Sequence, residues 1–471
     1  MRTVRCAIIR GAAGLRTASS TVVNVMKEQM LRRHVADQET IRKLKGEYGK
    51  EKLCDATVDA AYGGMRGITG LVYEPSLLDA EEGIRFRGLT ITECQEKLPK
   101  APGGVEPLPE AMFWLLMTGE VPTTEQVCAL NAELHRRADP EAIAAAQKVI
   151  KALPVNAHPM TAFSTGVLAL QTYSKFAAAY AAGKSNKKTY WEYALEDALD
   201  MLARTPAVAA MIYNRATKGQ TEVAAPSNSE LDWAANFASM LGFKEKEFWE
   251  CMRLYLSVHV DHEGGNVSAH TTTLVASALS DPYLAFSAGL NGLAGPLHGL
   301  ANQEVLKYLM SMQERVKADG VDMKDEAALE AALTKHTWAL LNSGQVVPGY
   351  GHAVLRKVDP RYTCQRNFCL RHRFDDDLFK LVEAVYKIMP GILTEHGKTK
   401  NPYPNVDAHS GVLLQHYGLT EQDCYPVLFG LSRQMGVMAA VVWDRLQGRP
   451  LERPKSITTE MLAQKYLRTS Q

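Results

Sequence analysis

The chain lacks the features that mark several common classes of protein. No uninterrupted apolar run comes near the roughly 18 residues of a membrane span, so no membrane is expected among its partners. There is no basic domain and no zinc or RNA-recognition motif, which argues against nucleic-acid binding. Strands and helices show neither a regular alternation nor a fixed repeat, which argues against Rossmann and solenoid folds.

Cysteines are few and do not pair in the sequence. The eight of them are scattered over 471 residues without a single CxxC. This spacing is typical of reduced, mostly structural thiols, and it argues against both a disulfide framework and a zinc site.

Acidic residues are absent from the N-terminal stretch, and the first of them is Glu28. The basic residues of this stretch are Arg2, Arg5, Arg10 and Arg16. An acid-free, arginine-rich stretch containing serine and alanine is typical of a mitochondrial transit peptide. We therefore expect residues 1–29 to be a transit peptide and N-terminal arm. The alternative is a flexible basic terminus without a targeting signal.

Three fragments of known motifs are incomplete. Gly183-Lys184-Ser185 resembles the end of a phosphate loop, but Ala178 stands where the first glycine belongs, so an ordinary loop is predicted. Gly349-x-Gly351 lacks the third glycine of a dinucleotide fingerprint. The segment His262-Glu263-Gly264-Gly265-Asn266 lacks the second histidine of an HExxH zinc motif.

Two hydrolase classes nevertheless stay open as alternatives. The metal-ligand chemistry for a hydrolase or lyase is present in His259, Asp261, His262, Glu263 and His270. A serine hydrolase would need Asp407, His409 and Ser410, but neighbours in sequence rarely form a triad, and there is no GxSxG elbow.

Helix signals dominate the chain, which predicts an all-α (mainly α-helical) fold. A capping pattern at Ser227 and Glu230 predicts the start of a helix that Gly242 ends. Further helices with core-facing apolar stripes are expected at residues 109–117, 274–279 and 428–446. Strand signals are confined to residues 71–73 and 84–86, which predicts one short β-hairpin near the N-terminus.

Residues 259–303 hold four of the thirteen histidines, and we expect the function to centre on them. His298 lies in Gly295-Pro296-Leu297-His298-Gly299, directly before an apolar stripe of helical period. The positive end of a helix favours a neutral imidazole, which can donate a hydrogen bond to a carbonyl that becomes an enolate. A capping or core histidine is the alternative reading.

Two further residues are candidates for the chemistry. His352 follows Gly349-Tyr350-Gly351, a bend in which the backbone can approach a ligand closely. Asp407 follows Pro404-Asn405-Val406 in a predicted loop that could hold a carboxylate away from water. A turn or N-cap role is the alternative for Asp407.

Three arginines form a second group: Arg361, Arg433 and Arg453. Guanidinium groups bind carboxylates with two hydrogen bonds, so several that converge would suit a dicarboxylate substrate. Sequence cannot show convergence, and a lone arginine is usually a surface charge.

Several motifs, taken together and in order, resemble the citrate synthase family. They are GPLHGLANQEV, VVPGYGHAVLRKVDPR, PNVDAHSG, FGLSRQMG and LERPKS, and the similarity runs from about residue 30 to near the C-terminus. The eukaryotic mitochondrial form is the most similar. This resemblance implies a two-domain homodimer in the mitochondrial matrix. The implied boundaries are 1–29 for the N-terminal segment, 30–298 for the large domain, 299–412 for the small domain and 413–471 for a C-terminal segment that returns to the large domain.

The resemblance also implies roles for individual residues. Asp407 would remove a methyl proton from acetyl-CoA, His298 would donate a hydrogen bond to the thioester oxygen, and His352 would act on the oxaloacetate carbonyl. The oxaloacetate-binding residues would be His262, Arg361, Arg433 and Arg453, the last from the other subunit. Arg66 and Arg356 match positions that contact CoA phosphates in relatives, whereas the Lys187/Lys188 stretch departs from the family.

No metal and no cofactor is expected, because acetyl-CoA is a substrate. The product of the implied reaction is citrate. The closest alternative is 2-methylcitrate synthase, which uses propionyl-CoA with similar residues.

Overall fold

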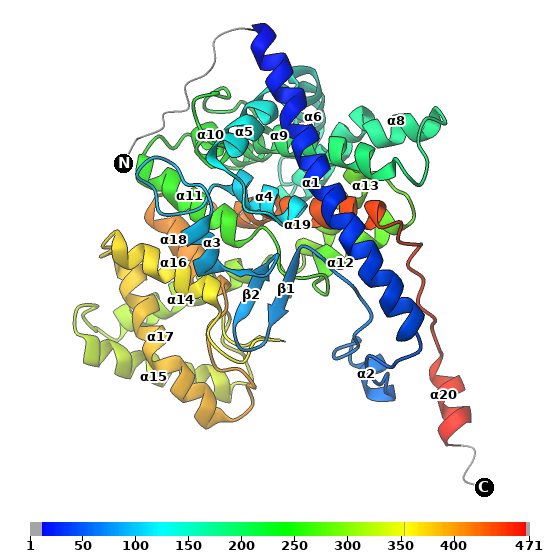
Figure 1. The fold of residues 1–471 in the computed structure, drawn as a ribbon. Coiled ribbons are helices and arrows are strands. Elements are labelled where there is room, and N and C mark those ends of the chain that lie inside the picture. The colour runs from blue at the N-terminus through cyan, green and yellow to red at the C-terminus, as the bar shows by residue number, and fades with distance from the viewer. Residues whose placement is uncertain (1–11, 353, 468–471) are drawn as a thin grey trace.

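The computed structural model describes residues 12–352 and 354–467, and helices make up most of this part of the chain (Figure 1). The first helices are α1 (Ala12–Glu47), α2 (Val58–Tyr62), α3 (Ile91–Lys97), α4 (Pro109–Thr118), α5 (Thr124–Arg137), α6 (Pro140–Ala152), α7 (Pro159–Leu170), η1 (Gln171–Tyr173) and α8 (Lys175–Ala181). They are followed by α9 (Tyr190–Lys218), α10 (Trp233–Leu241), α11 (Lys246–Val258), α12 (Val267–Ser277), α13 (Pro282–Leu293) and α14 (Ala301–Ala318). The last are α15 (Glu326–Asn342), α16 (Pro360–Arg371), α17 (Asp377–His396), α18 (Asp407–His416), η2 (Gln422–Cys424), α19 (Tyr425–Leu446) and α20 (Thr459–Tyr466).

A small antiparallel sheet contains the strands β1 (Ser76–Asp79), β2 (Gly83–Phe86) and β3 (Leu89–Thr90), in that order. The register pairs Ser76 with Phe86 and Leu78 with Ile84, and these four side chains are buried. The predicted hairpin is thus confirmed, with a third short strand added. The expected strand at 71–73 is wrong, because this segment has no ladder partner and the first strand begins only at Ser76.

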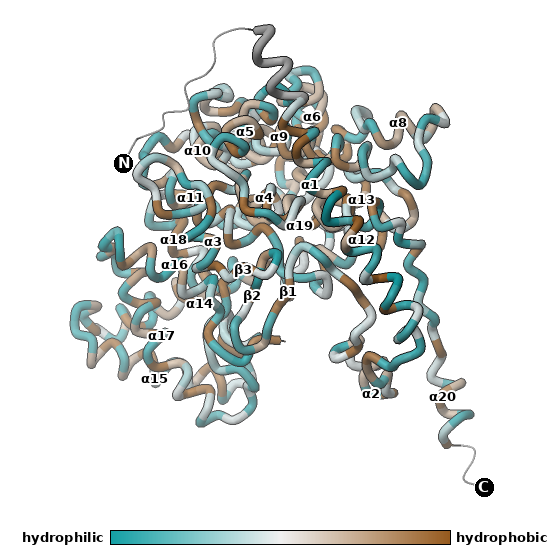
Figure 2. The backbone as a smooth tube through the Cα atoms, in the orientation of Figure 1, coloured by the Kyte–Doolittle hydropathy of each residue, from teal (hydrophilic) through white to brown (hydrophobic). Residues whose placement is uncertain are grey.

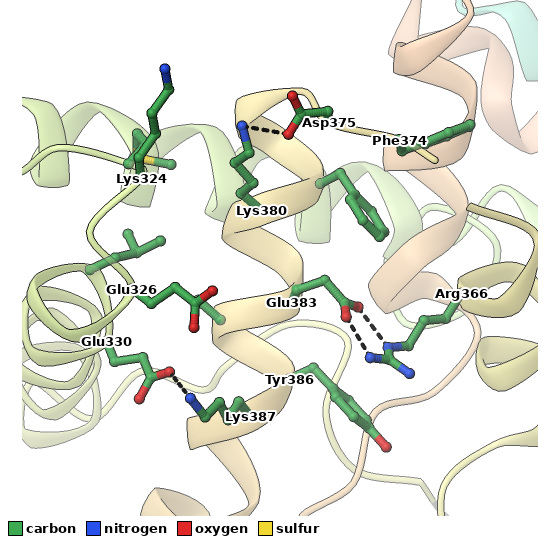
Figure 3. A pocket seen from close by; sticks show the side chains of 14 residues that line it. Lys324, Glu326, Glu330, Arg366, Phe374, Asp375, Lys380, Glu383, Tyr386 and Lys387 are labelled. Carbon is green, nitrogen blue, oxygen red and sulfur yellow. Dashed lines mark hydrogen bonds and ion pairs between the residues drawn. The ribbon is translucent and has the colours of Figure 1, made fainter. Parts of the chain in front are cut away.

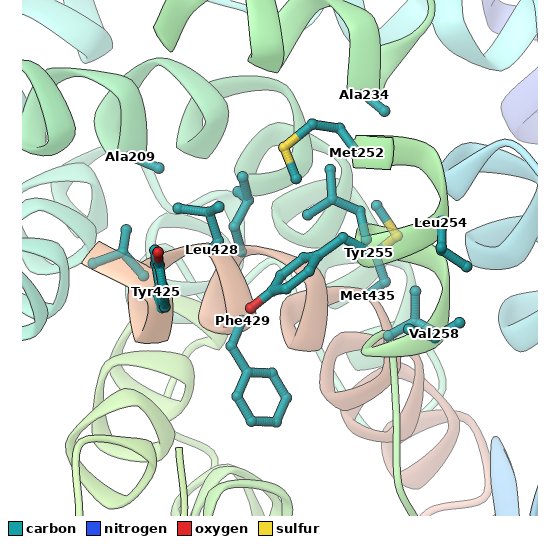
Figure 4. Close-up of a cluster of buried hydrophobic side chains, with 14 of the residues drawn as sticks. Ala209, Ala234, Met252, Leu254, Tyr255, Val258, Tyr425, Leu428, Phe429 and Met435 are labelled. Atoms are coloured by element: carbon teal, nitrogen blue, oxygen red, sulfur yellow. The ribbon is translucent and has the colours of Figure 1, made fainter. Parts of the chain in front are cut away.

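Helix α19 forms the centre of the core. Every residue from Tyr425 to Trp443 is buried, because α9, α4 and α12 cover it on different sides. Figure 4 shows its aromatic and methionine side chains among those of α11, with Tyr255, Phe429 and Met435 close together. Within the described residues, Gln422–Leu446 is also the one helical stretch long and apolar enough to cross a membrane. Ser432, Arg433 and Gln434 interrupt this stretch, so the expectation that no uninterrupted apolar run approaches the length of a membrane span still holds, and the helix lies wholly inside the protein.

The start of α10 differs from the prediction. Its N-cap is Asp232, whose side chain accepts a hydrogen bond from the backbone N–H of Ala235, so the capping pattern at Ser227 and Glu230 was misassigned. Asp232 lies directly before the first apolar residue, the position in which a capping carboxylate satisfies free N–H groups. Gly242 ends the helix with φ 112°, as predicted, because glycine tolerates this left-handed conformation.

Helices α12 and α13 pack closely against each other. The stripe at 274–279 was expected to face the core, but Leu274 is 39% exposed in the single chain. Val267 on α12 and Leu284 on α13 are also exposed. These apolar side chains are therefore available for contact with another molecule.

Helix α1 crosses the face of the molecule (Figure 1). Val22, Val23, Met26 and Met30 are buried against the body, and Figure 2 shows that the helix becomes hydrophilic toward its C-terminal end. Folded structure therefore begins inside the segment 1–29. Residues 1–11, with Arg2, Arg5 and Arg10 of the expected transit peptide, lie outside the described residues.

Helices α14 to α18 pack mainly against one another and form a separate group at the lower left of Figure 1. They fall within the residues expected for a small domain, while α19 returns to the helices that precede α14. The domain boundaries themselves stay a prediction.

Six cysteines are free thiols: Cys54, Cys94, Cys251, Cys364, Cys369 and Cys424.

Candidate active site

His298 lies in the tight turn between α13 and α14, three residues before the first residue of α14. Its Nε2 accepts a hydrogen bond from the backbone N–H of Ser268 at 3.3 Å and lies 2.9 Å from the Ser268 hydroxyl. A nitrogen that accepts an N–H cannot carry the proton of a neutral imidazole. The proton of His298 is therefore on Nδ1, where it can be donated to a ligand.

Burial, together with the charges of Arg433 and Arg361, lowers the pKa of His298 to about 3. The imidazole is thus neutral at physiological pH, as the sequence predicted. The helix N-terminus is not the main cause of this shift, because desolvation, which penalises the charged form, lowers the pKa most.

His352 is held with the opposite tautomer. The backbone N–H groups of Val354 and Leu355 both donate to its Nδ1 at 3.0 Å, which places the proton on Nε2. Burial and the nearby Arg361 charge lower the pKa of His352 to about 4. The site thus contains two neutral imidazoles, and each has one N–H that the backbone leaves free for a ligand.

The glycine-rich bend before His352 pairs with the segment before Asp407. Tyr350 and Pro404 form an isolated antiparallel bridge, and the backbone N–H of Asn405 donates to the Gly349 carbonyl at 2.9 Å. Gly349 has φ 80°, and a Cβ there would lie 3.1 Å from Ala408, so only glycine fits this approach. This pairing joins two segments that are more than fifty residues apart in sequence.

Asp407 is the first residue of α18 and not a loop residue, which corrects the prediction. Its backbone N–H donates to the Asn405 side chain at 3.0 Å, so Asn405 supports the start of the helix. Burial raises the pKa of Asp407 to about 7, although the Arg361 charge acts in the opposite direction. A carboxyl group with this pKa is suited to accept a proton near neutral pH.

Arg433 is a buried guanidinium in the middle of α19. Its hydrogen bonds go to neutral oxygens, namely the His259 carbonyl, the Asn266 amide and the Ser268 hydroxyl, and its guanidinium lies 4.8 Å from the centre of the Phe429 ring. Burial lowers the pKa of Arg433 to about 10, so the group stays charged at pH 7. Its charge is thus available to an anionic ligand.

Arg361 is the second residue of α16 and is also buried. Its guanidinium bonds to the Asp359 carboxylate at 2.7 Å, and Asp359 also caps the helix by accepting the Arg361 backbone N–H. One carboxylate therefore fixes both the backbone and the side chain of this arginine.

His262 supplies an unsatisfied polar atom. The residue is 8% exposed, and its Nε2 is buried without a hydrogen-bond partner. Its ring lies 5.6 Å from that of His352, centroid to centroid. Burial and the charges of Arg361 and Arg433 lower the pKa of His262 well below its usual value. A buried nitrogen without a partner is costly, and a ligand that bonds to it removes this cost.

The structure brings six of the predicted site residues into one electrostatic neighbourhood: His262, His298, His352, Arg361, Arg433 and Asp407. It does not bring Arg453 to them in the single chain, because Arg453 is exposed in the extended segment between α19 and α20. Arg66 and Arg356 are also exposed, the latter donating to the Val354 and Leu355 carbonyls.

Neither hydrolase alternative has the side-chain arrangement that it needs among the residues that the structure describes. Among the residues described, no group of three or more histidine, cysteine or acidic side chains is placed to hold a metal ion. The carboxylate of Asp261 instead accepts hydrogen bonds from Tyr73 and Ser76. The ring nitrogens of His409 and the Ser410 hydroxyl are buried without hydrogen-bond partners, so the proposed serine triad is wrong.

Sequence reasoning missed several supporting residues. Asn266 caps α12 and accepts a hydrogen bond from Arg433. Its position directly before a helical stretch could have predicted the cap, but not the contact with Arg433. Ser268 orients His298 through its backbone N–H, a contact across thirty residues for which the sequence carries no signal.

A cavity of about 740 Å³ lies elsewhere, among α15, α16 and α17 (Figure 3). Its charged lining is largely self-paired, with Lys380 bonded to Asp375 at 2.8 Å and Arg366 to Glu383 at 2.7 Å. It shares no residue with the candidate active site.

The raised pKa of Asp407 makes a prediction for the pH profile. The value of kcat/KM for the substrate that Asp407 deprotonates should fall about tenfold per pH unit below pH 7 and level off above it, because only the ionised carboxylate can accept a proton. His298 and His352 stay neutral throughout this range and should add no inflection. Initial rates between pH 5.5 and 9 test this, and a flat profile below pH 7 would contradict it.

Fold and site together define a mainly helical protein in which buried histidines and arginines gather where an anionic ligand would fit their charges. A family model described as "Citrate synthase, C-terminal domain" matches residues 64–455. The chain therefore belongs to the citrate synthase family, a family of transferases, as its motifs predicted.

The relatives agree with this assignment. The chain is 85% identical to "Probable citrate synthase, mitochondrial" from Leishmania major over 99% of both chains. It is 55% identical to "Citrate synthase, mitochondrial" from Aspergillus niger over 96% of this chain and 94% of the relative. These names confirm a mitochondrial localisation, whereas the matrix stays a prediction. They give no support to the 2-methylcitrate synthase alternative.

Solved structures confirm the fold. Citrate synthase from Pyrobaculum aerophilum matches with a TM-score of 0.67 at 24% identity, covering 84% of this chain and 92% of that one. A ternary complex of citrate synthase from Thermoplasma acidophilum with carboxymethyl coenzyme A and oxaloacetate matches with the same TM-score at 21% identity, covering 86% and 97%.

Proposed function

We propose that the chain condenses acetyl-CoA with oxaloacetate and hydrolyses the resulting citryl-CoA to citrate and CoA. The observation that carries this proposal is the buried, unpartnered Nε2 of His262, which shares its surroundings with two buried guanidinium groups. A dicarboxylate with a keto group suits this set, because its carboxylates can pair with the two guanidinium groups and the unpartnered imidazole nitrogen can bond to the substrate.

The chemistry follows from the protonation states. Asp407 takes a methyl proton from acetyl-CoA while the Nδ1–H of His298 bonds to the thioester oxygen and stabilises the forming enol. The new carbon–carbon bond forms at the keto carbon of oxaloacetate, and the Nε2–H of His352 bonds to the oxygen that becomes the hydroxyl. Water then adds to the thioester of citryl-CoA and releases CoA as the thiol. No metal or cofactor takes part in this proposal, and Arg66 and Arg356 are its candidates for the CoA phosphates.

A thiol-release assay tests this function. Purified protein should release CoA from acetyl-CoA only when oxaloacetate is present, and the product should be citrate. Propionyl-CoA should react about 10–200-fold more slowly, the range expected when a site rejects one extra methylene. Equal or faster release from propionyl-CoA would favour 2-methylcitrate synthesis, and no release from either would contradict the assignment.

Oxaloacetate should bind first and close the molecule. Arg361 belongs to the α14–α18 group and Arg433 to α19, so a dicarboxylate held by both draws the two groups together. Small-angle scattering should show a smaller radius of gyration with oxaloacetate alone, and acetyl-CoA alone should leave the radius unchanged. An unchanged radius with both substrates would contradict this account.

The proposed active unit is a homodimer in which Arg453 serves the partner's oxaloacetate site. Two observations support it: Arg453 is exposed in an extended segment of its own chain, and exposed apolar side chains lie on α12 and α13. Mixing inactive Arg453→Ala protein with inactive Asp407→Asn protein should restore activity, up to about half of the wild-type value per mixed dimer, because one site is then intact. Proven subunit exchange without recovery would mean that Arg453 acts within its own chain.

A further inference from the structure

The extended segment after α19 is fixed at two points before it reaches Arg453. Arg449 pairs with Asp444 at 2.8 Å and with Glu74 at 3.3 Å, which ties the start of the segment to the body. The second point is Glu452, directly before Arg453. Residues 453–458 are exposed, so Glu452 is the last residue whose contacts set the direction in which Arg453 leaves the body.

Glu452 is anchored to α12 twice. Its carboxylate lies 2.7 Å from His270 Nε2, and its backbone N–H donates to the Ser277 hydroxyl at 3.0 Å. Positions 270 and 277 are seven residues apart, which places them on one face of the helix about 10 Å from each other. Glu452 therefore lies along this face, with both its backbone and its side chain fixed.

The same helix contacts the active site of its own chain. Its N-cap residue Asn266 accepts from Arg433, and Ser268 orients His298. None of these contacts involves His270, whose ring nitrogen is directed to Glu452. His270 thus helps to hold the extended segment after α19 and takes no part in the chemistry of its own chain.

We propose that the His270–Glu452 pair is a positioning clamp that delivers Arg453 to the active site of the partner subunit. This inference rests on the proposed homodimer with a shared arginine. A pair that acts through Arg453 has an unusual property: its loss impairs the site of the other chain and leaves its own chain's site intact. A pair that merely stabilises the fold would not make this distinction.

The experiment uses a mixture with a single working site. One chain carries Arg453→Ala and keeps Asp407, and the other carries Asp407→Asn and keeps Arg453. Activity comes only from the mixed dimer, whose working site lies on the first chain and borrows Arg453 from the second. Glu452→Ala is then introduced into either chain, and mixed dimers are purified with two different affinity tags.

Glu452→Ala on the chain that donates Arg453 should raise the KM for oxaloacetate about 3–10-fold, with a smaller change in kcat. The same substitution on the chain that carries the working site should change KM by less than about twofold. His270→Ala should reproduce both results, and the double variant should add little to either single one, because both substitutions break one contact. Glu460→Ala, which removes an exposed carboxylate further along the same tail, is the matched control and should change nothing.

Equal effects from both chains, or an effect only on the chain with the working site, would overturn the clamp. If the parent mixture has no activity despite proven exchange, the shared site fails first, and the clamp fails with it. Thermal unfolding temperatures of all variants identify loss of folding, and His270→Ala provides the second test if Glu452→Ala does not fold.

Discussion

The Asp407→Asn variant is expected to lose between about 10² and 10⁴ of its kcat, the usual contribution of a positioned base. Asparagine keeps the size of the side chain and, at the first position of α18, leaves the hydrogen bond from its backbone N–H to Asn405 intact. It cannot take a proton at any pH in the working range. Oxaloacetate binding, measured by calorimetry, should change little because Arg361, Arg433 and His262 remain.

Asp377→Asn is a matched control for this variant. Asp377 is likewise the first residue of its helix, α17, but its side chain is exposed on the surface. This substitution should leave kcat unchanged. An Asp407→Asn enzyme that keeps more than about a tenth of the wild-type kcat would show that the base is another residue.

The His298→Ala variant is expected to lose about 10² to 10³ in kcat, the cost of removing one donor to a developing oxyanion. The loss should fall on the enolisation step, so acetyl-CoA methyl protons should exchange with solvent more slowly in parallel. This exchange can be followed by NMR in the presence of a non-reacting oxaloacetate analogue. Binding of oxaloacetate should be largely kept.

The Ser268→Ala variant tests which group of Ser268, the backbone N–H or the hydroxyl, orients His298. The variant loses the hydroxyl beside His298 but keeps the backbone N–H that donates to Nε2 and so fixes the tautomer. Its kcat should fall less than tenfold. A loss as large as that of His298→Ala would mean that the hydroxyl, and not the backbone, orients the ring.

Local patterns predicted much of the helical architecture. Pro109 starts α4, Gly242 ends α10, and His298 precedes α14, because caps and apolar periods are set by neighbours in sequence. The neutral state of the His298 imidazole was also predictable. Its main cause was not, since burial depends on helices that are distant in the sequence.

Errors arose where long-range contacts decide. The position of Asp407 at a helix start depends on Asn405 and on pairing with the Gly349 bend. Leu274 was expected in the core because its stripe is apolar, yet this face of α12 is exposed in the single chain. Local sequence patterns could not show which arginines converge, because Arg361 and Arg433 come from different helix groups.

The placement of Arg433 also matters before the chain folds. Helix α19 is long and apolar enough to be taken for a membrane span, and Arg433 lies near its middle. An arginine at the centre of a candidate span adds about 2.5–3.5 kcal/mol to the apparent cost of insertion into lipid. Before the chain folds, the helices that bury this segment do not yet cover it. The side chain proposed to hold substrate therefore also lowers the tendency of its own helix to insert into a bilayer.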